Sequence, residues 1–582
     1  MSNVPPAVVL LCGALLLPLL PRWARSLAFL LFSVVTLALL LRLEEGSSTS
    51  LRFLAFDLVP MQVDRLSLAF GYVFVLITFL GGIYSIYLQD TGQQVAALIY
   101  AGSSLGVLFA GDLFTLFVYW ELMAVASAFL VLARRTERSR RAGTRYLLVH
   151  LFGGSVLLAG ILWHFTDTGS LLFDRFDYGP AAYLILFSFS LNGAIPPLHA
   201  WLADAYPEGT ITGSVFLSAF TTKTAVYVLA RGFAGWDFLV WAGVIMAIYG
   251  VVFAVLENDI RRLLAYHIIS QVGYMVTAVG LGTEAAINGA TAHAFSHILY
   301  KGLLFMGAGA VLYSTNRSKL TELGGLARAM PVALSLYMVG AFSISGFPLF
   351  SGFVSKSLVL QAAELRHEET VVLLLYLAAV GTFLHTGLKL PYFIWFGPQR
   401  DLKPGPIPWS MYAGMVLTAG MNVAIGLYPR LLYDLMPFTV DYRPYTTSHV
   451  METIQLLTFT GLGFWFLIDK LGGKPTITLD FDWFYRKPAP FFFRVTVVLV
   501  DSLFTAAEVR TLNLARALAK ACANPAQFAS RFLPQSNARG GWGLDDAKVF
   551  YDPNRYRHPV GFAILVVLSC FVLLLAWNLF LG

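Results

Sequence analysis

Residues 192–197 read Asn-Gly-Ala-Ile-Pro-Pro, and residues 346–352 read Gly-Phe-Pro-Leu-Phe-Ser-Gly. Each of these runs interrupts a long apolar stretch. Proline removes a backbone donor and glycine loosens a helix, so both runs free carbonyls and amides that hydrocarbon cannot satisfy. Such interruptions belong beside water or ions. The residues expected to break the two helices are Gly193, Pro196, Pro197, Gly346, Pro348 and Gly352.

The composition is that of a protein that crosses a membrane many times. Hydrophobic residues fill 57% of the 582 positions and charged residues only 13%, unlike the more even mixture of a soluble domain. The formal net charge is +7, but the basic residues stand in short loops between apolar runs, so nucleic-acid binding is not indicated. Because Cys12, Cys522 and Cys570 show no paired or metal-ligand spacing, no metal or cofactor is expected.

Apolar runs of about 17 to 25 residues, the length of a membrane-spanning helix, recur along the whole chain. The sequence predicts an all-α polytopic membrane protein with about 14 to 16 transmembrane helices. The first run precedes Arg22 and Arg25 and has no basic leader, so we expect a retained helix and not a cleaved signal peptide. The expected spans lie near residues 6–21, 26–42, 65–88, 95–111, 113–133, 146–165, 180–206, 210–232, 238–257, 263–282, 287–314, 330–364, 370–397, 409–428, 450–469 and 558–581.

The two interrupted spans are the seventh and the twelfth of this series, which is what an inverted structural repeat of five spans leaves in a sequence. The alternative is that glycine and proline are simply common in membrane helices. The repeat interpretation divides the chain into N-terminal helices (1–94), a first repeat (95–235), a second repeat (236–400), additional helices (401–478), a lateral segment (479–557) and an anchor helix (558–582).

Basic loops set the expected orientation, because Lys and Arg favour the cytoplasmic side of short loops. Alternation from an outside N-terminus places most basic loops inside and the acidic loop 166–179 outside. The loops around Asp90 and around residues 206–210 do not fit this pattern. The basic pairs and loops expected inside are Arg22/Arg25, 134–145, Arg261/Arg262, Arg317/Lys319, Arg400/Lys403 and Lys470/Lys474.

Ionisable side chains stand in the middle of several apolar spans. Each costs about 2.5 to 3.5 kcal/mol at bilayer depth, so we expect them to line a hydrated path. Glu121 can hold or pass a proton or balance a buried lysine, and its alternative role is a structural ion pair between helices. Lys223 lies well inside the eighth span, and Lys356 lies a turn beyond the second helix break.

His293, His297 and Lys301 have the spacing i, i+4 and i+8, which places them on one helical face. Such a stripe can relay protons through water, and histidine titrates near neutral pH. The competing interpretations are a metal site at the His-x-x-x-His pair, which lacks a third ligand, and ordinary hydrogen bonding between helices. His199 and His267 either extend the path or are structural.

Four runs of sequence, in this order, carry a family resemblance: residues 117–123, 197–205, 262–275 and 297–306. They resemble the antiporter-like subunits shared by Mrp cation/proton antiporters, respiratory complex I and membrane-bound hydrogenases, in particular the D subunit of Mrp antiporters. The resemblance covers about residues 65–400.

The resemblance implies proton translocation through two linked half-channels, with a glutamate and lysine pair in the first and a lysine in the second. Glu121, Lys223, Lys301 and Lys356 match the glutamate and the lysines of the family. Asn192 stands where the family has a lysine in the first broken helix. Asparagine can hold a water molecule but cannot carry charge, so the first half-channel departs from the family at a central place.

The chain changes character after residue 478. Residues 491–528 scatter charged side chains through apolar positions, which predicts a lateral amphipathic helix pinned to the membrane by residues 558–581. Some antiporter-like subunits of complex I and hydrogenases end in this way, and the likeness implies neighbouring subunits. The alternative is a further transmembrane span over residues 495–507.

The sequence thus predicts a proton-translocating subunit of a multisubunit complex in a bacterial cytoplasmic membrane. Its predicted partners are other membrane subunits, the lipid bilayer, protons and Na⁺ or another monovalent cation. One alternative is a proton-pumping subunit of a complex I-like or hydrogenase-type redox complex, or of an inorganic-carbon uptake complex. A third class, an intramembrane enzyme or scaffold, is disfavoured because no nucleotide, metal or nucleophile motif is present.

Overall fold

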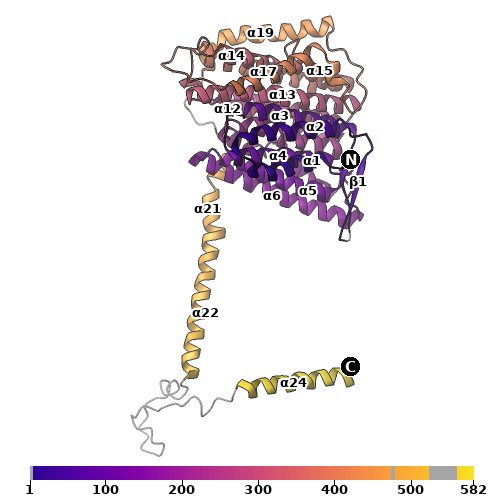
Figure 1. Ribbon diagram of the computed structural model, residues 1–582, viewed down its shortest axis with the longest axis vertical. Helices are drawn as coiled ribbons and strands as arrows, with labels where there is room; N and C mark the ends of the chain where they lie inside the picture. The colour runs from indigo at the N-terminus through magenta and orange to yellow at the C-terminus, as the bar shows by residue number, and fades with distance from the viewer. Residues whose placement is uncertain (1–3, 55, 473–478, 524–559, 582) are drawn as a thin grey trace, which may run out of the picture. The chain divides into compact units, whose positions relative to one another are not determined.

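The computed structural model describes residues 4–54, 56–472, 479–523 and 560–581. The chain divides into two compact units, residues 1–482 and 483–582. In the first unit the long helices run side by side with their axes nearly aligned (Figure 1). The prediction of an all-α polytopic membrane protein is confirmed.

The first unit contains helices of very different length and burial. Helices α12 and α13 form its centre, because 100% and 94% of their apolar windows are buried. Its α-helices are α1 (Pro6–Leu16), α2 (Arg22–Leu40), α3 (Arg65–Tyr84), α4 (Thr91–Phe109), α5 (Leu113–Leu132), α6 (Glu137–Thr168), α7 (Pro180–Asn192), α8 (Ala200–Ala205), α9 (Gly213–Ala219), α10 (Thr221–Gly232), α11 (Asp237–Leu256), α12 (Ile260–Leu281), α13 (Glu284–Thr315), α14 (Pro331–Ser345), α15 (Ser351–Leu365), α16 (Glu369–Thr382), α17 (Trp409–Leu427), α18 (Arg430–Tyr433) and α19 (Thr447–Leu471). Short 3-10 segments are η1 (Leu17–Leu19), η2 (Tyr206–Glu208) and η3 (Leu320–Glu322), and π-helical segments are η4 (Phe383–Lys389) and η5 (Tyr392–Phe396).

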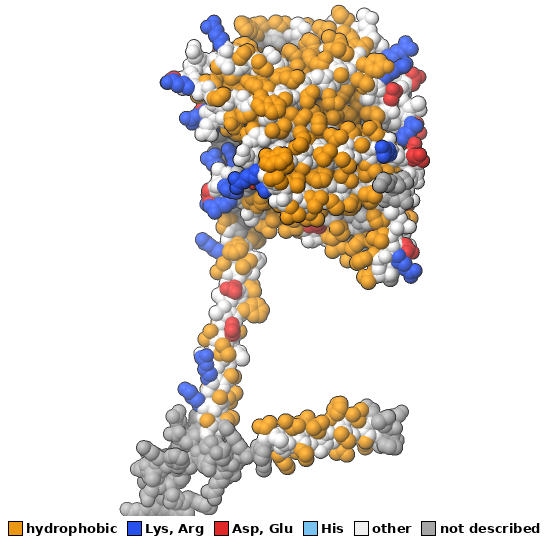
Figure 2. Space-filling model, in the orientation of Figure 1, with side chains coloured by type: hydrophobic (Ala, Val, Ile, Leu, Met, Phe, Trp, Pro, Cys, Tyr) orange, Lys and Arg blue, Asp and Glu red, His pale blue; other side chains and the backbone are white. Residues whose placement is uncertain are grey.

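The described helices include 13 that are long and apolar enough to cross a membrane, and three shorter apolar helices. Figure 2 shows a broad apolar band over the first unit, with most charged side chains gathered toward the two ends of the helices. This is the surface of an integral membrane protein, since a band facing hydrocarbon must be apolar and charge must collect at the interfaces.

A two-stranded antiparallel sheet, which was not predicted from the sequence, connects α2 to α3. Strands β1 (Ser48–Phe53) and β2 (Phe56–Gln62) pair Ser48 with Gln62 and Phe53 with Phe56. The Val59 N–H donates to the Asp112 carboxylate at 2.8 Å, which ties the hairpin to the start of α5. Long apolar runs predict membrane spans, and these two short strands contain none.

Side-chain caps explain where several long helices begin. Asp64 and Ser67 form a capping box at the start of α3, and Asp112 accepts from the Thr115 N–H at 2.7 Å. Thr136 caps α6 and Asp259 caps α12 in the same way. An N-terminal cap satisfies backbone donors that have no partner inside the helix, so each polar residue marks the end of an apolar span.

Both predicted helix breaks are present. Helix α7 ends at Asn192 and α8 begins at Ala200, while α14 ends at Ser345 and α15 begins at Ser351. Gly346 has a φ of 75°, a left-handed conformation that glycine adopts without strain. A Cβ on Gly352 would lie 1.7 Å from the Ser343 carbonyl oxygen, so the two half-helices meet too closely for any side chain there.

A third interruption was not predicted. The eighth span consists of α9 and α10, which meet at Phe220 with φ −93° and ψ −71°. The thirteenth span continues from α16 into the π-helical segment η4. Neither site carries a glycine-proline signature, so no local residue signals the change. The inverted relation of the two repeats stays a prediction.

Glycines bring α11 and α12 into backbone contact. A Cβ on Gly243 would lie 2.3 Å from the Thr277 backbone nitrogen, and one on Gly280 would lie 2.3 Å from that of Val240. Gly250 and Gly273 meet backbone atoms of the partner helix at 2.5 Å. Small residues at such a seam let membrane helices approach closely enough for dense packing, which drives their association in lipid.

Contacts between loops define one end of the unit, which we call the basic end. Here Arg134 pairs with Glu208 at 3.0 Å, and Arg145 makes a two-pronged ion pair with Asp204 at 2.7 and 2.9 Å. Arg261 donates to the Gly209 carbonyl at 2.8 Å. The basic loops 134–145 and 261–262 therefore share one end with loop 206–210, whose charge did not fit the pattern. The membrane side that this end faces stays a prediction.

The second unit consists of helices that bury little within the described chain. They are α20 (Asp482–Arg486, which starts at the boundary), α21 (Ala489–Phe493), the π-helical segment η6 (Arg494–Val498), α22 (Leu499–Ala523) and α24 (Val560–Leu581). No residue of α22 is buried. The predicted lateral segment 491–528 is helical as far as Ala523, and its last residues lie outside the described part. Its lateral placement stays a prediction.

Candidate functional site

The predicted stripe on α13 lies at the centre of the first unit. His293, His297 and Lys301 each have a relative exposure of 0%. His293 Nδ1 lies 3.2 Å from Ser355 Oγ on α15, and its Nε2 lies 3.5 Å from the Tyr300 hydroxyl. Both ring nitrogens of His297 and the Lys301 Nζ are buried without a protein partner. Buried polar atoms of this kind are satisfied by ordered water, so the stripe has the character of a hydrated site.

Lys356 reaches the stripe from α15 and is held by the second helix break. Its Nζ donates to the Ile344 carbonyl at 2.5 Å, and it lies 5.5 Å from the centre of the Tyr274 ring. The carbonyl belongs to the last turn of α14, where no further helical N–H is available to it. The break therefore supplies the lysine with an acceptor.

Lys223 is bound in the same manner at the interruption between α9 and α10. Its Nζ donates to the Ser218 carbonyl at 2.5 Å and to Thr222 Oγ1 at 3.1 Å. Ser218 lies in the last turn of α9. The negative end of a helix dipole attracts a cation, so each lysine meets a helix C-terminus in place of a carboxylate.

Glu121 lies on α5 and faces α6. Its Oε1 atom is buried without a partner. A Cβ on Gly154 would lie 1.6 Å from that oxygen, so the missing side chain of Gly154 makes the room that the carboxylate occupies. Among the ion pairs of the described residues, none joins Glu121 to Lys223.

A series of hydroxyl groups and one histidine lies on α6 and its neighbours. The Tyr146 hydroxyl contacts Ser127 Oγ at 2.8 Å and Thr221 Oγ1 at 3.4 Å. His150, which is fully buried with both ring nitrogens unpartnered, packs edge-on against the Tyr146 ring with 4.1 Å between ring centres. His150 stands one helical turn from Gly154. It was not predicted as a site residue, although the i, i+4 spacing to Tyr146 and Gly154 carried the signal.

Three further groups lead from the centre toward the basic end. The rings of His267 on α12 and His385 on η4 are 6.0 Å apart, and all four of their nitrogens are buried without a partner. Lys389 Nζ donates to the Val255 carbonyl at 2.7 Å, again in the last turn of a helix. His385 and Lys389 were not predicted, because their span reads as apolar apart from these residues.

Electrostatic contacts join the central groups into one cluster. His297 interacts with Lys223, Lys301 and Lys356, and His267 interacts with Lys301 and His385. The structure therefore brings together five of the predicted path residues, and it adds His267. Glu121 is not among the groups of this cluster.

Two predicted path residues lie at the first helix break. Asn192 ends α7 and is buried, and neither of its side-chain polar atoms has a protein partner. His199 lies just before α8, with its Nε2 3.1 Å from Asp480 Oδ1. Asp480 was not among the predicted site residues, since it stands 281 positions away in the sequence.

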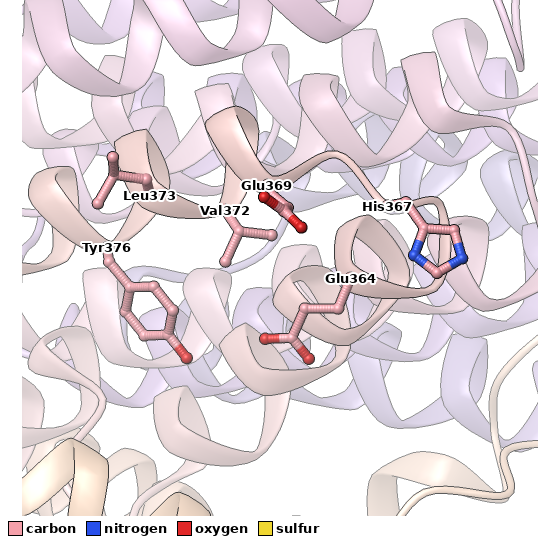
Figure 3. A pocket seen from close by; sticks show the side chains of 6 residues that line it. All are labelled: Glu364, His367, Glu369, Val372, Leu373 and Tyr376. Atoms are coloured by element: carbon pink, nitrogen blue, oxygen red, sulfur yellow. The ribbon is translucent and has the colours of Figure 1, made fainter.

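A separate pocket of about 390 Å³ opens at the turn between α15 and α16. Figure 3 shows the Glu364 and Glu369 carboxylates and the Tyr376 ring around it, with His367 at one side. None of its lining residues belongs to the central cluster.

Fold and site together define a class of protein: a polytopic membrane protein in which interrupted helices hold buried lysines and histidines without carboxylate partners. The family described as "NADH:quinone oxidoreductase/Mrp antiporter, TM" matches residues 110–382, which include the first helix break, the stripe and Lys356. The chain belongs to this family.

Known relatives share moderate sequence identity. The chain is 31% identical over 355 residues to an uncharacterised protein of Methanocaldococcus jannaschii, covering 57% of this chain and 73% of the relative. It is also 31% identical over 422 residues to the large A-type component of the Na(+)/H(+) antiporter of Alkalihalophilus pseudofirmus, covering 64% of this chain but only 52% of that relative.

A chain in the structure of the membrane-bound sulfane sulfur reductase (MBS), an archaeal respiratory membrane complex, shares the fold. Its TM-score is 0.69 at 22% sequence identity, and the match covers 98% of this chain and 100% of the other.

Proposed function

We propose that this chain is a proton-translocating subunit of a multisubunit membrane complex that exchanges Na⁺ or another monovalent cation for protons. One observation carries the proposal: buried lysines and histidines form a connected cluster whose polar atoms are bound by helix-end carbonyls or have no protein partner. Groups in such surroundings can gain and lose a proton without breaking an ion pair. Kinship with a component of a Na(+)/H(+) antiporter supports the choice of cation.

The proposed mechanism passes charge between neighbouring sites. A proton bound at one lysine disfavours the charged form of the next through like-charge repulsion, so the sites fill and empty in turn. Lys223, the His293/His297/Lys301 stripe and Lys356 form this series. Glu121 connects to it through His150, Tyr146 and Thr221, which lie between α5 and Lys223. Asn192 holds water rather than charge in this series.

The remaining partners are part of the same proposal. We assign the complex to a bacterial cytoplasmic membrane, with the N-terminus outside and the basic end inside, because basic loops favour the cytoplasm. Other membrane subunits cover the apolar helices of the second unit.

A redox-driven proton pump is the second candidate. The observation that favours it is the match along nearly the whole chain to a chain of the MBS complex, because that match extends beyond the family region into the second unit. An Mrp complex structure from Dietzia matches 77% of this chain.

The test is transport by the intact complex in inverted membrane vesicles. A Na⁺ pulse at a fixed proton gradient is expected to release or take up protons in wild-type vesicles and not in vesicles that lack this chain. Iron-sulfur subunits in the purified complex, together with no response to Na⁺, would instead support the redox pump.

A further inference from the structure

Asp480 stands outside the apolar spans, yet its carboxylate is inserted into the basic end of the first unit. Its side chain is only 1% exposed and that of His199 is 0% exposed. Besides the bond from His199 Nε2, Asp480 accepts hydrogen bonds from the Tyr249 hydroxyl on α11 and, at 2.6 Å, from the Tyr266 hydroxyl on α12. The Phe481 N–H donates to the same carboxylate.

These bonds leave the carboxylate charged. Burial by itself raises the pKa of Asp480, but the hydrogen bonds from His199, Tyr249 and Tyr266 outweigh burial and hold that pKa well below its usual range. The charged groups around the site are Arg262, whose side chain bonds Tyr266 and pairs with Glu257 at 3.3 Å, and Asp482. Among the described residues, the ion-pair partner of Asp480 is His199.

The other ring nitrogen of His199 is free. Its Nδ1 is buried and has no protein partner. Because a carboxylate accepts but does not donate, the neutral imidazole must place its hydrogen on Nε2, which leaves the lone pair on Nδ1. Carboxylates fix histidine tautomers in this way in metal sites and in hydrolases. The arrangement therefore presents a proton acceptor at the first helix break.

We propose that His199 and Asp480 form a proton-storing dyad at the basic end, in which Nδ1 of His199 takes up the proton and Asp480 is the positioning residue. The step is balanced. A proton arriving through water forms an N–H bond at Nδ1, the ring becomes an imidazolium, and its Nε2–H stays bonded to the carboxylate. Release from Nδ1 returns the proton to water and restores the neutral ring. The dyad serves the transport proposed above and rests on it.

Glutamine and asparagine separate storage from anchoring. In His199→Gln the amide nitrogen replaces Nε2 and still donates to Asp480, but no atom replaces Nδ1, so a merely structural link would be preserved. In Asp480→Asn the amide can donate to Nε2 and favour the wrong tautomer, whereas Asp480→Glu keeps the acceptor. The matched control is Asp434→Asn, because Asp434 is exposed.

The experiment measures Na⁺-driven proton movement by the full complex in vesicles, normalised to the amount of this chain in the membrane. We expect His199→Gln and Asp480→Asn each to lower the rate about tenfold or more, the double variant to be no worse than either, and Asp480→Glu to recover activity. Full activity in His199→Gln, or additive losses in the double variant, would overturn the dyad. Lack of transport in the wild-type complex would instead refute the proposed function.

Discussion

Three buried lysines share the same kind of partner, a main-chain carbonyl in the last turn of a helix. Lys223 binds the end of α9, Lys356 the end of α14 and Lys389 the end of α11. A helix C-terminus carries a partial negative charge, which stabilises an ammonium group without a titrating counter-ion. This is a weaker partner than a carboxylate, so the lysine can lose its proton and leave no unpaired acid behind.

Lys356→Met tests this at the central cluster. Methionine fills a similar volume without charge, so we expect transport to fall at least about tenfold, a change of about 1.4 kcal/mol in the barrier. Thermal stability in detergent should stay equal or rise, because a charged group at bilayer depth costs about 2.5 to 3.5 kcal/mol. The control is the exposed Lys403→Met. A less stable protein with normal transport would contradict a relay role.

Gly154→Ala tests Glu121 without changing its charge. The new methyl group would lie 1.6 Å from Glu121 Oε1, so the carboxylate must move. We expect a loss of transport comparable to that of Glu121→Gln, measured in the same vesicles. Gly153→Ala is the matched control, since its methyl group meets Leu191 at an ordinary 3.4 Å. Equal rates in the two alanine variants would remove Glu121 from the path.

The helix breaks show how far local sequence carried the prediction of structure. Glycine and proline at residues 192–197 and 346–352 revealed two interruptions, and an i, i+4 spacing revealed the stripe on α13. The break at Phe220 carries no such residues, because tertiary packing and the bond from Lys223 hold it. Asp480 and His385 were missed because their partners are distant in sequence, and a single chain gives no sign of such contacts.

Gly352→Ala tests the closeness of the second break. A methyl group 1.7 Å from the Ser343 carbonyl oxygen forces α14 and α15 apart, and overpacking of this kind costs about 1 to 3 kcal/mol. We expect a lower unfolding temperature in detergent and weaker transport. Gly461→Ala on α19 has open space around it and should be neutral or slightly stabilising, since alanine favours a helix over glycine. Unchanged stability in Gly352→Ala would show that the half-helices are not in firm contact.

The whole molecule separates into two units with different needs. The first unit buries its own centre, whereas the described α22 buries no residue and exposes apolar side chains such as Leu503, Phe504 and Leu514. A chain that ends after Asp482 keeps the dyad and all path residues. We expect it to insert and to unfold at the same temperature as the full chain, but to co-purify with fewer subunits. Unfolding of the shortened protein would show that the first unit depends on the second.

The glycine seam between α11 and α12 has a consequence for motion. Two helices whose backbones touch at several points along their length behave as a single stiff plate, because any sliding would drive peptide groups into one another. The interrupted helices on either side lack this bracing. During a transport cycle the plate stands still, and what travels past it is solvent and charge.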